Sequence, residues 1–293
     1  MSFVVATLAI DVGASKIAGA LVGADFEILH KFEKSARKSL YGIADPDLAI
    51  TKAMITELLE VAKSQGIHVK NGGACFAEYV TPDQLLNSKD QIGWEIQPKD
   101  DFATLTGFEW NIESDVRAMA RAEAQYSGIS DFLFVTISSG ISHVLMIDGK
   151  PWVGATGEAI GFGITQIDNS KDSPTLEQFS SGMGITRRFQ NATNQDVSST
   201  EEVFAIYNLN ESAKKIIDSA SSVLGKALAA FVDYLDPAKI VIGGGLWLGS
   251  EQYRSMVIKS YDENASKRRK APQILSSTIG KNAAVIGAAI AAK

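Results

Sequence analysis

The stretch "LAIDVGASKIAGALV", Leu8 to Val22, decides the expected fold. Its apolar residues, many of them β-branched, break at Gly13 and resume, which predicts two antiparallel strands joined by a tight turn. A glycine turn exposes backbone N–H groups that can hold phosphate oxygens. Beside them, Lys16 and the Ser15 hydroxyl can bind phosphate, and Asp11 can hold Mg²⁺ through water. An ordinary solvated hairpin turn uses the same residue types, so this stretch alone leaves both interpretations open.

A second hairpin is predicted much later in the chain. The segment "FLFVTISSGISHVLMIDGKPWVG", residues 132–154, again runs from an apolar strand through a glycine turn into another apolar strand. Ser138, Ser139 and Gly140 offer hydroxyls and amides at that turn, although serines before glycine are also common turn residues. Two copies of strand, phosphate-sized turn and strand predict a duplicated α/β architecture with a cleft between its halves.

Two further features follow the same order along the chain. Asp115 stands alone at the predicted start of the helix "VRAMARAEAQYSG". Gly243, Gly244 and Gly245 come directly after the buried strand "KIVI", where a nucleotide can lie against a backbone without side chains. A triple glycine is also a common plain turn, so its position in the series matters more than its composition.

Composition narrows the classes of protein that this chain can represent. Its 293 residues exceed the usual size of a single core, which predicts two lobes. A net charge of −6, from 28 Lys and Arg against 34 Asp and Glu, gives no electrostatic footprint for nucleic acid or anionic membrane. We expect no signal peptide and no membrane span. The single cysteine, Cys75, excludes an internal disulfide and a cysteine-based zinc site, and favours a cytoplasmic location.

Taken together, these motifs resemble the ROK family of bacterial sugar kinases and repressors. The resemblance covers nearly the whole chain, and it is carried by "IDVGASKIAGALV", "NIESDVRAMARAEAQYSG", "FVTISSGISHVLMIDGKPWVGATG", "TLEQFSSGMGI" and "YLDPAKIVIGGG". It implies an α/β, two-lobed actin-like ATPase (ribonuclease H-like) fold with a cleft between the lobes. We expect the N-terminal lobe to hold residues 1–117 plus 279–293, and the C-terminal lobe to hold residues 118–278.

The resemblance also implies which residues bind the nucleotide and perform the chemistry. The family's first phosphate motif matches Asp11 to Lys16, its second matches Ser138 to Gly140, and its adenosine-side glycines match Gly243 to Gly245. The catalytic aspartate falls on Asp115, which would accept the proton of a sugar hydroxyl that attacks the γ-phosphate of ATP. Asp115 can equally serve as the N-cap of its helix, and the two roles are compatible.

The sequence departs from the family pattern on the sugar side. Ser114 replaces an asparagine that binds the sugar. Where the family has Gly-Glu-x-Gly-His, this chain reads "IGFGI", so that Gly161 replaces the glutamate and Ile164 the histidine. A shift of one residue would instead bring Glu158 to the glutamate position and Phe162 to the histidine position. We favour the ungapped alignment.

Other candidates for a sugar contact remain in the chain. Glu177 matches a glutamate that the family uses near the sugar, and it can also be a helix-start carboxylate. Glu78 and Tyr79 stand in "CFAEY", which replaces a turn that lines the family's sugar pocket. Because a hydrogen bond from a charged group contributes roughly 1.5 to 3 kcal/mol, losing two or three of them weakens hexose binding by about three powers of ten or more. These losses predict either a substrate other than the family's usual hexose or a sugar site that has lost its function.

The family's zinc-binding cysteines are absent from this chain. The segment before "TLEQFSSG" is "DNSKDSP", which offers no thiolate to a metal ion. We therefore expect no zinc in the family's form, and we expect packing to hold this loop instead.

These observations predict an ATP- and Mg²⁺-dependent sugar kinase that acts on a hydroxyl group of a hexose or hexose derivative. The resemblance makes a homodimer the expected assembly. The rival hypothesis is a catalytically degenerate relative that binds nucleotide or sugar in a regulatory role. A DNA-binding repressor is disfavoured, because the chain begins almost at the first phosphate hairpin and leaves no room for a helix-turn-helix.

Overall fold

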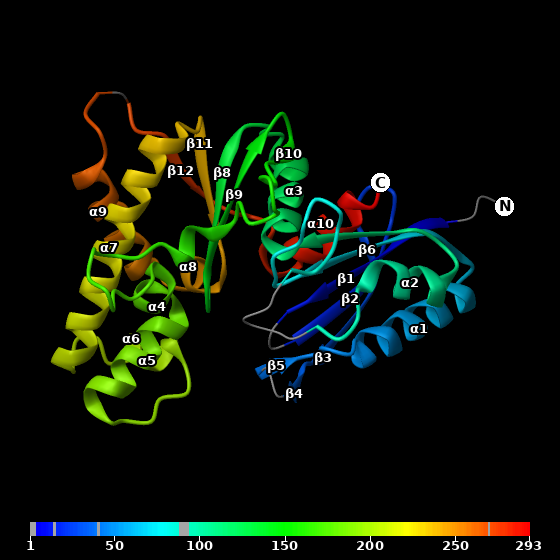
Figure 1. Cartoon of the computed structure of the whole chain (residues 1–293), viewed down its shortest axis with the longest axis horizontal. Coiled ribbons are helices and arrows are strands. Elements are labelled where there is room, and N and C mark those ends of the chain that lie inside the picture. The colour runs from blue at the N-terminus through cyan, green and yellow to red at the C-terminus, as the bar shows by residue number, and fades with distance from the viewer. Residues whose placement is uncertain (1–3, 14–15, 40–41, 88–93, 269) are drawn as a thin grey trace. The chain divides into compact units, whose positions relative to one another are not determined.

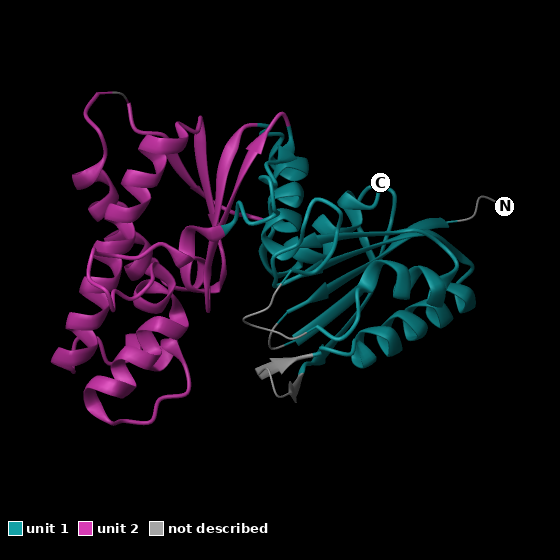
Figure 2. Cartoon of the chain, in the orientation of Figure 1, with its two compact units in different colours: residues 1–130, 149–160, 279–293 teal, residues 131–148, 161–278 magenta. Residues whose placement is uncertain are grey.

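The computed structural model describes residues 4–13, 16–39, 42–87, 94–268 and 270–293 (Figure 1). The chain divides into two compact units (Figure 2): unit 1 holds residues 1–130, 149–160 and 279–293, and unit 2 holds residues 131–148 and 161–278. The predicted lobe boundary at residue 117 therefore differs from the observed division. It falls inside helix α3 (Asp115–Ser127), whose continuous turns keep the residues beyond 117 in unit 1.

Unit 1 is built on a five-stranded mixed sheet with the order β3-β2-β1-β6-β7. Strands β1 to β3 are antiparallel, whereas β6 and β7 run parallel to β1. The strands are β1 (Val4–Val12), β2 (Lys16–Val22), β3 (Ile28–Ser35), β6 (Ile67–Phe76) and β7 (Trp110–Ser114). The smaller elements of the unit are the β4 (Arg37–Ser39) and β5 (Gly42–Ala44) pair, α2 (Pro98–Thr106), β10 (Lys150–Pro151) and η2 (Gly280–Asn282).

The two faces of β1 bury different side chains, because successive residues of a strand point to opposite sides of a sheet. Leu8 and Ile10 join the core that packs around α1 (Ala49–Ser64). Ala9 lies on the other face, in a cluster of small residues that includes Ala288 of α10 (Ala283–Ala291). The short side chains on this second face allow α10 to approach the sheet closely.

Glycines permit the tight packing of α10. A Cβ atom at Gly73 of β6 would collide with the carbonyl oxygen of Ala288, and a Cβ atom at Gly287 would collide with the carbonyl oxygen of Ala118 in α3. The C-terminal segment therefore packs between the sheet and α3 through backbone contacts.

Unit 2 repeats the same plan with different residues. Its strands β9, β8, β11 and β12 follow one another across a mixed sheet, with β8 and β9 antiparallel and β11 parallel to both β8 and β12. Their bounds are β8 (Phe132–Ile137), β9 (Ile141–Ile147), β11 (Lys239–Gly243) and β12 (Gln273–Ser276). Both predicted hairpins, at Gly13 and at Gly140, are thus confirmed, and the duplicated α/β architecture explains why they look alike.

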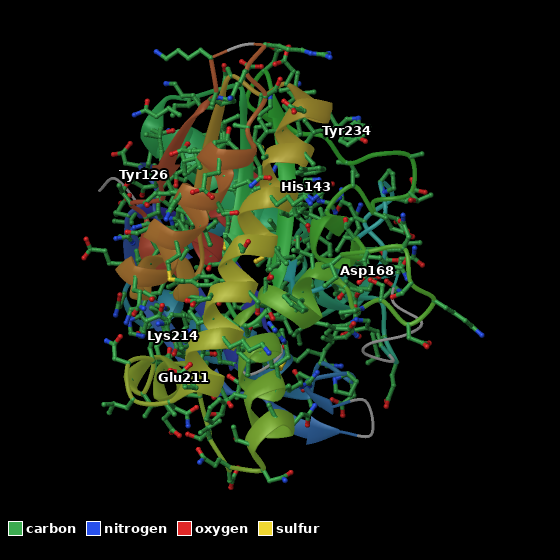
Figure 3. All side chains as sticks on the ribbon, turned by 90° about the vertical axis from the view of Figure 1, so that its left-hand side faces the viewer. Tyr126, His143, Asp168, Glu211, Lys214 and Tyr234 are labelled. Carbon is green, nitrogen blue, oxygen red and sulfur yellow. The ribbon has the colours of Figure 1, made fainter. Side chains whose placement is uncertain are left out.

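Helices pack around the large core of unit 2. The longest is α7 (Glu211–Leu235), which carries Glu211 near one end and Tyr234 near the other (Figure 3). Gly225 allows α9 (Glu251–Asn264) to lie close to α7, since a Cβ atom there would be 2.5 Å from Ser260 Cβ. The remaining helices are η1 (Gly161–Ile164), α4 (Leu176–Ser180), α5 (Gly182–Thr193), α6 (Thr200–Ala205), α8 (Gly245–Gly249) and α9 (Glu251–Asn264).

Candidate functional site

The first hairpin of unit 1 holds three of the predicted phosphate-site residues. Asp11 is near the end of β1, and the backbone N–H of Gly13 donates to the Lys16 carbonyl at 2.9 Å, which closes the turn. The Lys16 ammonium pairs with the Glu33 carboxylate at 3.2 Å, and its hydrogen bond lowers the pKa of Glu33. Glu33, on β3, is a partner of this lysine that the sequence did not indicate. Ser15, also predicted to bind phosphate, lies outside the described residues.

The Asp11 carboxylate sits against the only cysteine of the chain. The Cys75 thiol donates to Asp11 Oδ1 at 3.6 Å, and Cys75 is fully buried in β6. Burial raises the pKa of Asp11 to about 6, and the nearby Lys16 charge acts in the opposite direction. Burial also raises the pKa of Cys75, so the thiol stays protonated as a hydrogen-bond donor. A carboxylate whose charge is poorly solvated is a suitable partner for a divalent cation.

Asp115 is the first residue of α3, directly after β7. Its Oδ1 accepts a hydrogen bond from the Val116 backbone N–H at 2.6 Å. Burial raises the pKa of Asp115 to about 7, and the Asp11 and Glu78 charges push it in the same direction, whereas the Val116 hydrogen bond and the Arg117 charge lower it. The Asp11 and Glu78 charges thus act on Asp115 within unit 1. A carboxylate that titrates near neutral pH can accept a proton in a reaction at physiological pH.

Asp115 is not the N-cap of α3, so this alternative role is wrong. The N-cap position belongs to Ser114, in extended conformation, and its side chain makes no capping bond. The Ser114 side chain is fully buried, and its Oγ has no hydrogen-bond partner among the described residues. A buried hydroxyl without a partner is uncommon in folded proteins, so Ser114 marks an unsatisfied polar position beside Asp115.

Glu78 and Glu158 are placed differently with respect to solvent. Glu78 is buried, and it accepts hydrogen bonds from the Tyr79 backbone N–H at 2.8 Å and from the Trp94 indole N–H at 3.2 Å. Glu158 is exposed, and its carboxylate accepts from the Asn87 amide at 3.4 Å. Both carboxylates belong to unit 1, where Asp115 also lies.

In unit 2, the second hairpin turn is held by the helices that follow it in sequence. The Ser138 backbone N–H donates to the Gly140 carbonyl at 2.8 Å, which closes the turn. The Ser138 and Ser139 carbonyls accept from the first N–H groups of α5, those of Gly182 at 2.8 Å and Met183 at 3.2 Å. The turn carbonyls are therefore bound to α5.

Glu177 fixes the same turn from α4. Its Oε2 accepts a hydrogen bond from the Ile141 backbone N–H at 2.7 Å. A Cβ atom at Gly140 would lie 2.6 Å from that oxygen, so glycine is needed at position 140 for this contact. The sequence resemblance suggested Glu177 as a sugar contact, whereas its observed partner is the backbone of the second hairpin.

The triple glycine lies beside the second turn. Gly243 ends β11, Gly244 has a φ of 95°, and Gly245 begins α8. A Cβ atom at Gly244 would collide with the Ile137 carbonyl oxygen, and one at Gly245 would be 3.4 Å from Ser138 Oγ. Unit 2 thus brings together the two glycine-bearing segments that the sequence assigned to the nucleotide.

The segment that replaces the family's sugar motif carries no charged side chain at the key positions. Gly161 is the first residue of the short helix η1 and Ile164 is the last, and the Ile164 side chain is exposed whereas Phe162 is buried. The Phe162 backbone N–H donates to His143 Nδ1 at 3.1 Å, so this histidine of β9 serves as an acceptor for the backbone. His143 is buried in unit 2.

Hydrogen bonds close the loop that lacks the family's cysteines. Asp168 Oδ1 accepts from the Ser170 backbone N–H at 2.8 Å, and Ser173 Oγ accepts from the Asp168 backbone N–H at 3.0 Å. Thr175 and Gln178 then form a capping box at the start of α4. We expected packing to hold this loop in place of zinc, and the structure adds hydrogen bonds from polar side chains to the loop backbone. No group of three or more His, Cys, Asp or Glu residues that could hold a metal ion occurs within the described parts of the chain.

The two mixed sheets, each built from an antiparallel hairpin followed by parallel strands, define an actin-like ATPase fold. A model of the ROK family matches residues 7–293, and the chain belongs to that family. Predictions of both the family and the fold are therefore confirmed.

Comparison with known proteins shows which activities occur among similar chains. The chain is 27% identical over 263 residues to an N-acetylmannosamine kinase of Citrobacter koseri. The aligned region covers 86% of this chain and 87% of that protein. It is 29% identical over 179 residues to the bifunctional enzyme NanE/NanK of Brucella melitensis, with 60% of this chain aligned. The aligned part spans only 34% of that bifunctional relative.

Solved structures of the same fold include both enzymes and regulators. A ROK family glucokinase from Streptomyces griseus, in complex with glucose and AMPPNP, has a TM-score of 0.80 at 23% identity, over 98% of this chain and 99% of that one. A ROK family transcriptional regulator, a homologue of the E. coli MLC protein, has a TM-score of 0.79 at 20% identity, over 98% of this chain and 77% of that one. At these identities the likeness concerns the fold.

None of the helices in the described residues combines the length and the apolar character that crossing a bilayer requires.

Proposed function

We propose that this chain is an ATP-dependent kinase that phosphorylates a hydroxyl group of a hexose or hexose derivative, with Asp115 as the general base. The observation that carries the proposal is the Asp115 carboxylate, which starts α3 and has a pKa of about 7. A general base works best when its pKa lies near the operating pH. Sugar kinases among the similar proteins support the same reaction class.

The residues of unit 1 fit a magnesium ion. Asp11 and Asp115 are two poorly solvated carboxylates, and the Asp11 charge raises the pKa of Asp115 further, a cost that a nearby divalent cation relieves. Asp11 would hold Mg²⁺ through water, and the bound ion supplies positive charge against the phosphate oxygens of ATP. For ATP itself, Gly245 of unit 2 is exposed and carries no side chain, so a nucleotide can approach its backbone. We assign phosphate binding to Gly13, Ser15, Lys16, Ser138, Ser139 and Gly140, and the adenosine side to Gly243, Gly244 and Gly245.

In the reaction, Asp115 orients the attacking sugar hydroxyl and takes its proton. The hydroxyl oxygen forms a bond to the γ-phosphorus while the bond from that phosphorus to the bridging oxygen breaks, and ADP leaves with the electron pair. The proton that Asp115 accepts is released to solvent after the sugar phosphate departs. The raised pKa of Asp115 favours this role, because an Asp115 with an ordinary pKa of 3.8 would be a weaker base.

We assign sugar contacts to Ser114, Glu78, Glu158 and Glu177. The buried, unpartnered hydroxyl of Ser114 beside Asp115 supports its assignment most directly. Glu78 and Glu177 already accept backbone hydrogen bonds, so a sugar would share these carboxylates with the protein. The substitutions at positions 161 and 164 favour a substrate that differs from glucose.

The test is a panel of hexoses and hexose derivatives that includes glucose and N-acetylmannosamine. Purified protein with ATP and Mg²⁺ should release ADP with at least one sugar and form the matching sugar phosphate, detected by mass spectrometry. Asp115→Asn should abolish turnover and keep nucleotide binding, whereas Asp262→Asn, at an exposed position of α9, should behave as wild type. The absence of phosphorylation across the whole panel would overturn the proposal.

A second function is favoured by one set of observations. Ser114, Gly161 and Ile164 replace polar sugar-binding residues of the family, and a transcriptional regulator shares this fold. A regulatory relative would bind nucleotide or sugar without turnover, which calorimetry detects. Assembly into a homodimer also stays a prediction, and analytical ultracentrifugation tests it.

A further inference from the structure

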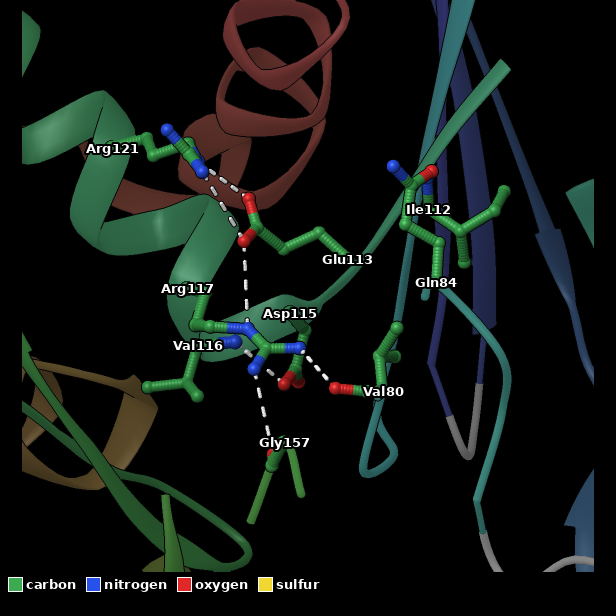
Figure 4. Close-up of polar contacts among 9 residues, drawn as sticks. All are labelled: Val80, Gln84, Ile112, Glu113, Asp115, Val116, Arg117, Arg121 and Gly157. Carbon is green, nitrogen blue, oxygen red and sulfur yellow. Dashed lines mark hydrogen bonds and ion pairs between the residues drawn. The ribbon is translucent and has the colours of Figure 1, made fainter. Parts of the chain in front are cut away.

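The Arg117 guanidinium is buried at the centre of unit 1. Its side chain is only 2% exposed, and it reaches groups from three different segments (Figure 4). Nε lies 3.4 Å from the Glu113 carboxylate, Nη2 donates to the Val80 carbonyl at 2.7 Å, and Nη1 donates to the Gly157 carbonyl at 3.4 Å. One planar cation therefore joins the end of β7, the segment after β6 and the turn that contains Gly157.

The charge of Arg117 is balanced within unit 1. Glu113, also buried, pairs with Arg117 through Oε1, whereas Arg121 donates to both oxygens, from Nε to Oε2 at 2.5 Å and from Nη2 to Oε1 at 3.4 Å. Burial lowers the pKa of Arg117, and the Glu113 charge acts against that effect. Because a buried cation is costly without partners, the two carbonyl contacts complete the set that makes its position tolerable. The Arg117 side chain is consequently fixed in place.

The two segments that Arg117 binds also touch each other. Gly157 has a φ of 89°, and a Cβ atom at this position would collide with the Val80 carbonyl oxygen. A second link joins the Asn87 amide to the Glu158 carboxylate at 3.4 Å. The spacing between these segments thus depends on a glycine contact and on the guanidinium that holds both carbonyls.

We propose that Arg117 is a positioning residue that sets the spacing of the sugar-contacting carboxylates and thereby the choice of sugar. Val80 follows Glu78 and Tyr79 in sequence, and Gly157 precedes Glu158, so the two carbonyls bound by Arg117 belong to the segments that carry Glu78 and Glu158. The identity of the ligand rests on the proposed function. The mechanical role, holding the two segments together, rests on the hydrogen bonds of Arg117 alone.

Arg121 provides a matched control. It pairs with the same Glu113 carboxylate, but among the described residues it makes no contact with Val80 or Gly157. Arg117→Met should raise the KM for the sugar about tenfold or more, with kcat and the KM for ATP changed less than about threefold. Arg121→Met should leave all three values near wild type. Arg117→Lys should recover part of the loss, since an ammonium keeps the charge but cannot bridge both carbonyls in the same way.

Hydrogen exchange separates the positioning role from the proposed function. Amides in segments 77–87 and 152–160 should exchange faster in Arg117→Met than in wild type, and at the wild-type rate in Arg121→Met. If the wild-type protein phosphorylates no sugar but Arg117→Met still exchanges faster than wild type in both segments, the positioning role is upheld while the proposed function fails. Unchanged exchange in both segments of Arg117→Met, or equal effects of the two substitutions, would overturn the inference.

A second variant covers the case in which Arg117→Met does not fold. Gly157→Ala keeps Arg117 and adds one methyl group against the Val80 carbonyl, in a backbone conformation that alanine adopts only with strain. It should raise the KM for the sugar and speed exchange in segments 77–87 and 152–160. Wild-type values for both measurements in Gly157→Ala would contradict the inference.

Discussion

The Glu177 carboxylate accepts a hydrogen bond from the Ile141 backbone N–H at 2.7 Å, directly after the turn that carries Ser138 to Gly140. This contact joins α4 to the start of β9, and the first N–H groups of α5 bind the Ser138 and Ser139 carbonyls from the same region. The second hairpin turn is therefore held in one conformation before any ligand arrives. A fixed turn avoids the entropic cost of ordering it during phosphate binding.

Substitution of Glu177 tests whether its carboxylate stabilises the second hairpin turn for nucleotide binding. Glu177→Ala removes the acceptor for the Ile141 N–H, so nucleotide affinity should fall about threefold to tenfold, because the turn is no longer held. Glu177→Gln keeps an oxygen acceptor and should bind nucleotide as wild type does. Titration calorimetry with AMPPNP measures both variants. A wild-type affinity in Glu177→Ala would show that the carboxylate does not stabilise the turn.

Gly140 and Glu177 should behave as a coupled pair. Gly140→Ala places a methyl group 2.6 Å from the Glu177 carboxylate, which must move and lose its hydrogen bond to Ile141. We expect a destabilisation on the order of 1 kcal/mol in the wild-type background and much less in a Glu177→Ala background. Urea unfolding of the four proteins in the cycle provides the coupling energy. Strictly additive effects would argue against the contact.

The hairpins and their glycines are the part of the fold that the sequence predicts well. Strand alternation, a glycine turn and a second strand are local features, and the structure has β1 with β2 and β8 with β9 at those places. The small residues of α10 likewise predict close packing, which Gly73 and Gly287 permit. Local patterns of this kind do not depend on distant parts of the chain.

The contacts of the candidate site depend on residues far apart in sequence, which explains what the sequence does not predict. Arg117 binds carbonyls that are 37 and 40 positions away, at Val80 and Gly157. Lys16 pairs with Glu33 on a neighbouring strand, and Glu177 is engaged by the backbone of β9. Only the folded chain brings these groups together, and backbone carbonyls leave no mark in the residue pattern.

Activity should depend on pH through Asp115. With a pKa of about 7 in the free protein, the carboxylate is protonated in most molecules below that pH and cannot act as a base. The value of kcat/KM should therefore rise with pH and level off above a pH of about 7. A steady-state pH profile with a saturating nucleotide and a low sugar concentration measures this limb. A flat profile from about pH 5 to pH 8 would contradict the assignment.

Stability should have the opposite dependence on pH at the same residue. The pKa of Asp115 in the folded protein is raised above its ordinary value of 3.8. The resulting contribution to the free energy of unfolding is therefore complete below pH 3.8 and is lost as the pH rises through about 7. Asp115→Asn cannot ionise, so it should gain stability relative to wild type between pH 5 and pH 8, on the order of 1 kcal/mol. Urea unfolding at the two pH values tests this sign. A relative loss at the higher pH would contradict it.

The loop from Asp168 to Ser173 should contribute to stability without a metal ion. Asp168→Ala removes the acceptor for the Ser170 N–H, and we expect a lower urea midpoint than in wild type. Treatment with a zinc chelator should leave the melting temperature of the wild-type protein unchanged. Asp172→Ala in the same loop is the matched control, at an exposed position. A marked fall in melting temperature with the chelator would point to a metal-dependent fold.

The most direct test of the central claim is a comparison of wild type and Asp115→Asn in one assay of sugar phosphate formation, with AMPPNP affinity measured on the same preparations. We predict that wild type forms the phosphate of a hexose or hexose derivative, and that Asp115→Asn forms it at a rate lower by about a hundredfold or more, with AMPPNP affinity unchanged. Equal rates in the two proteins, or no phosphate transfer by wild type to any sugar, would contradict the account.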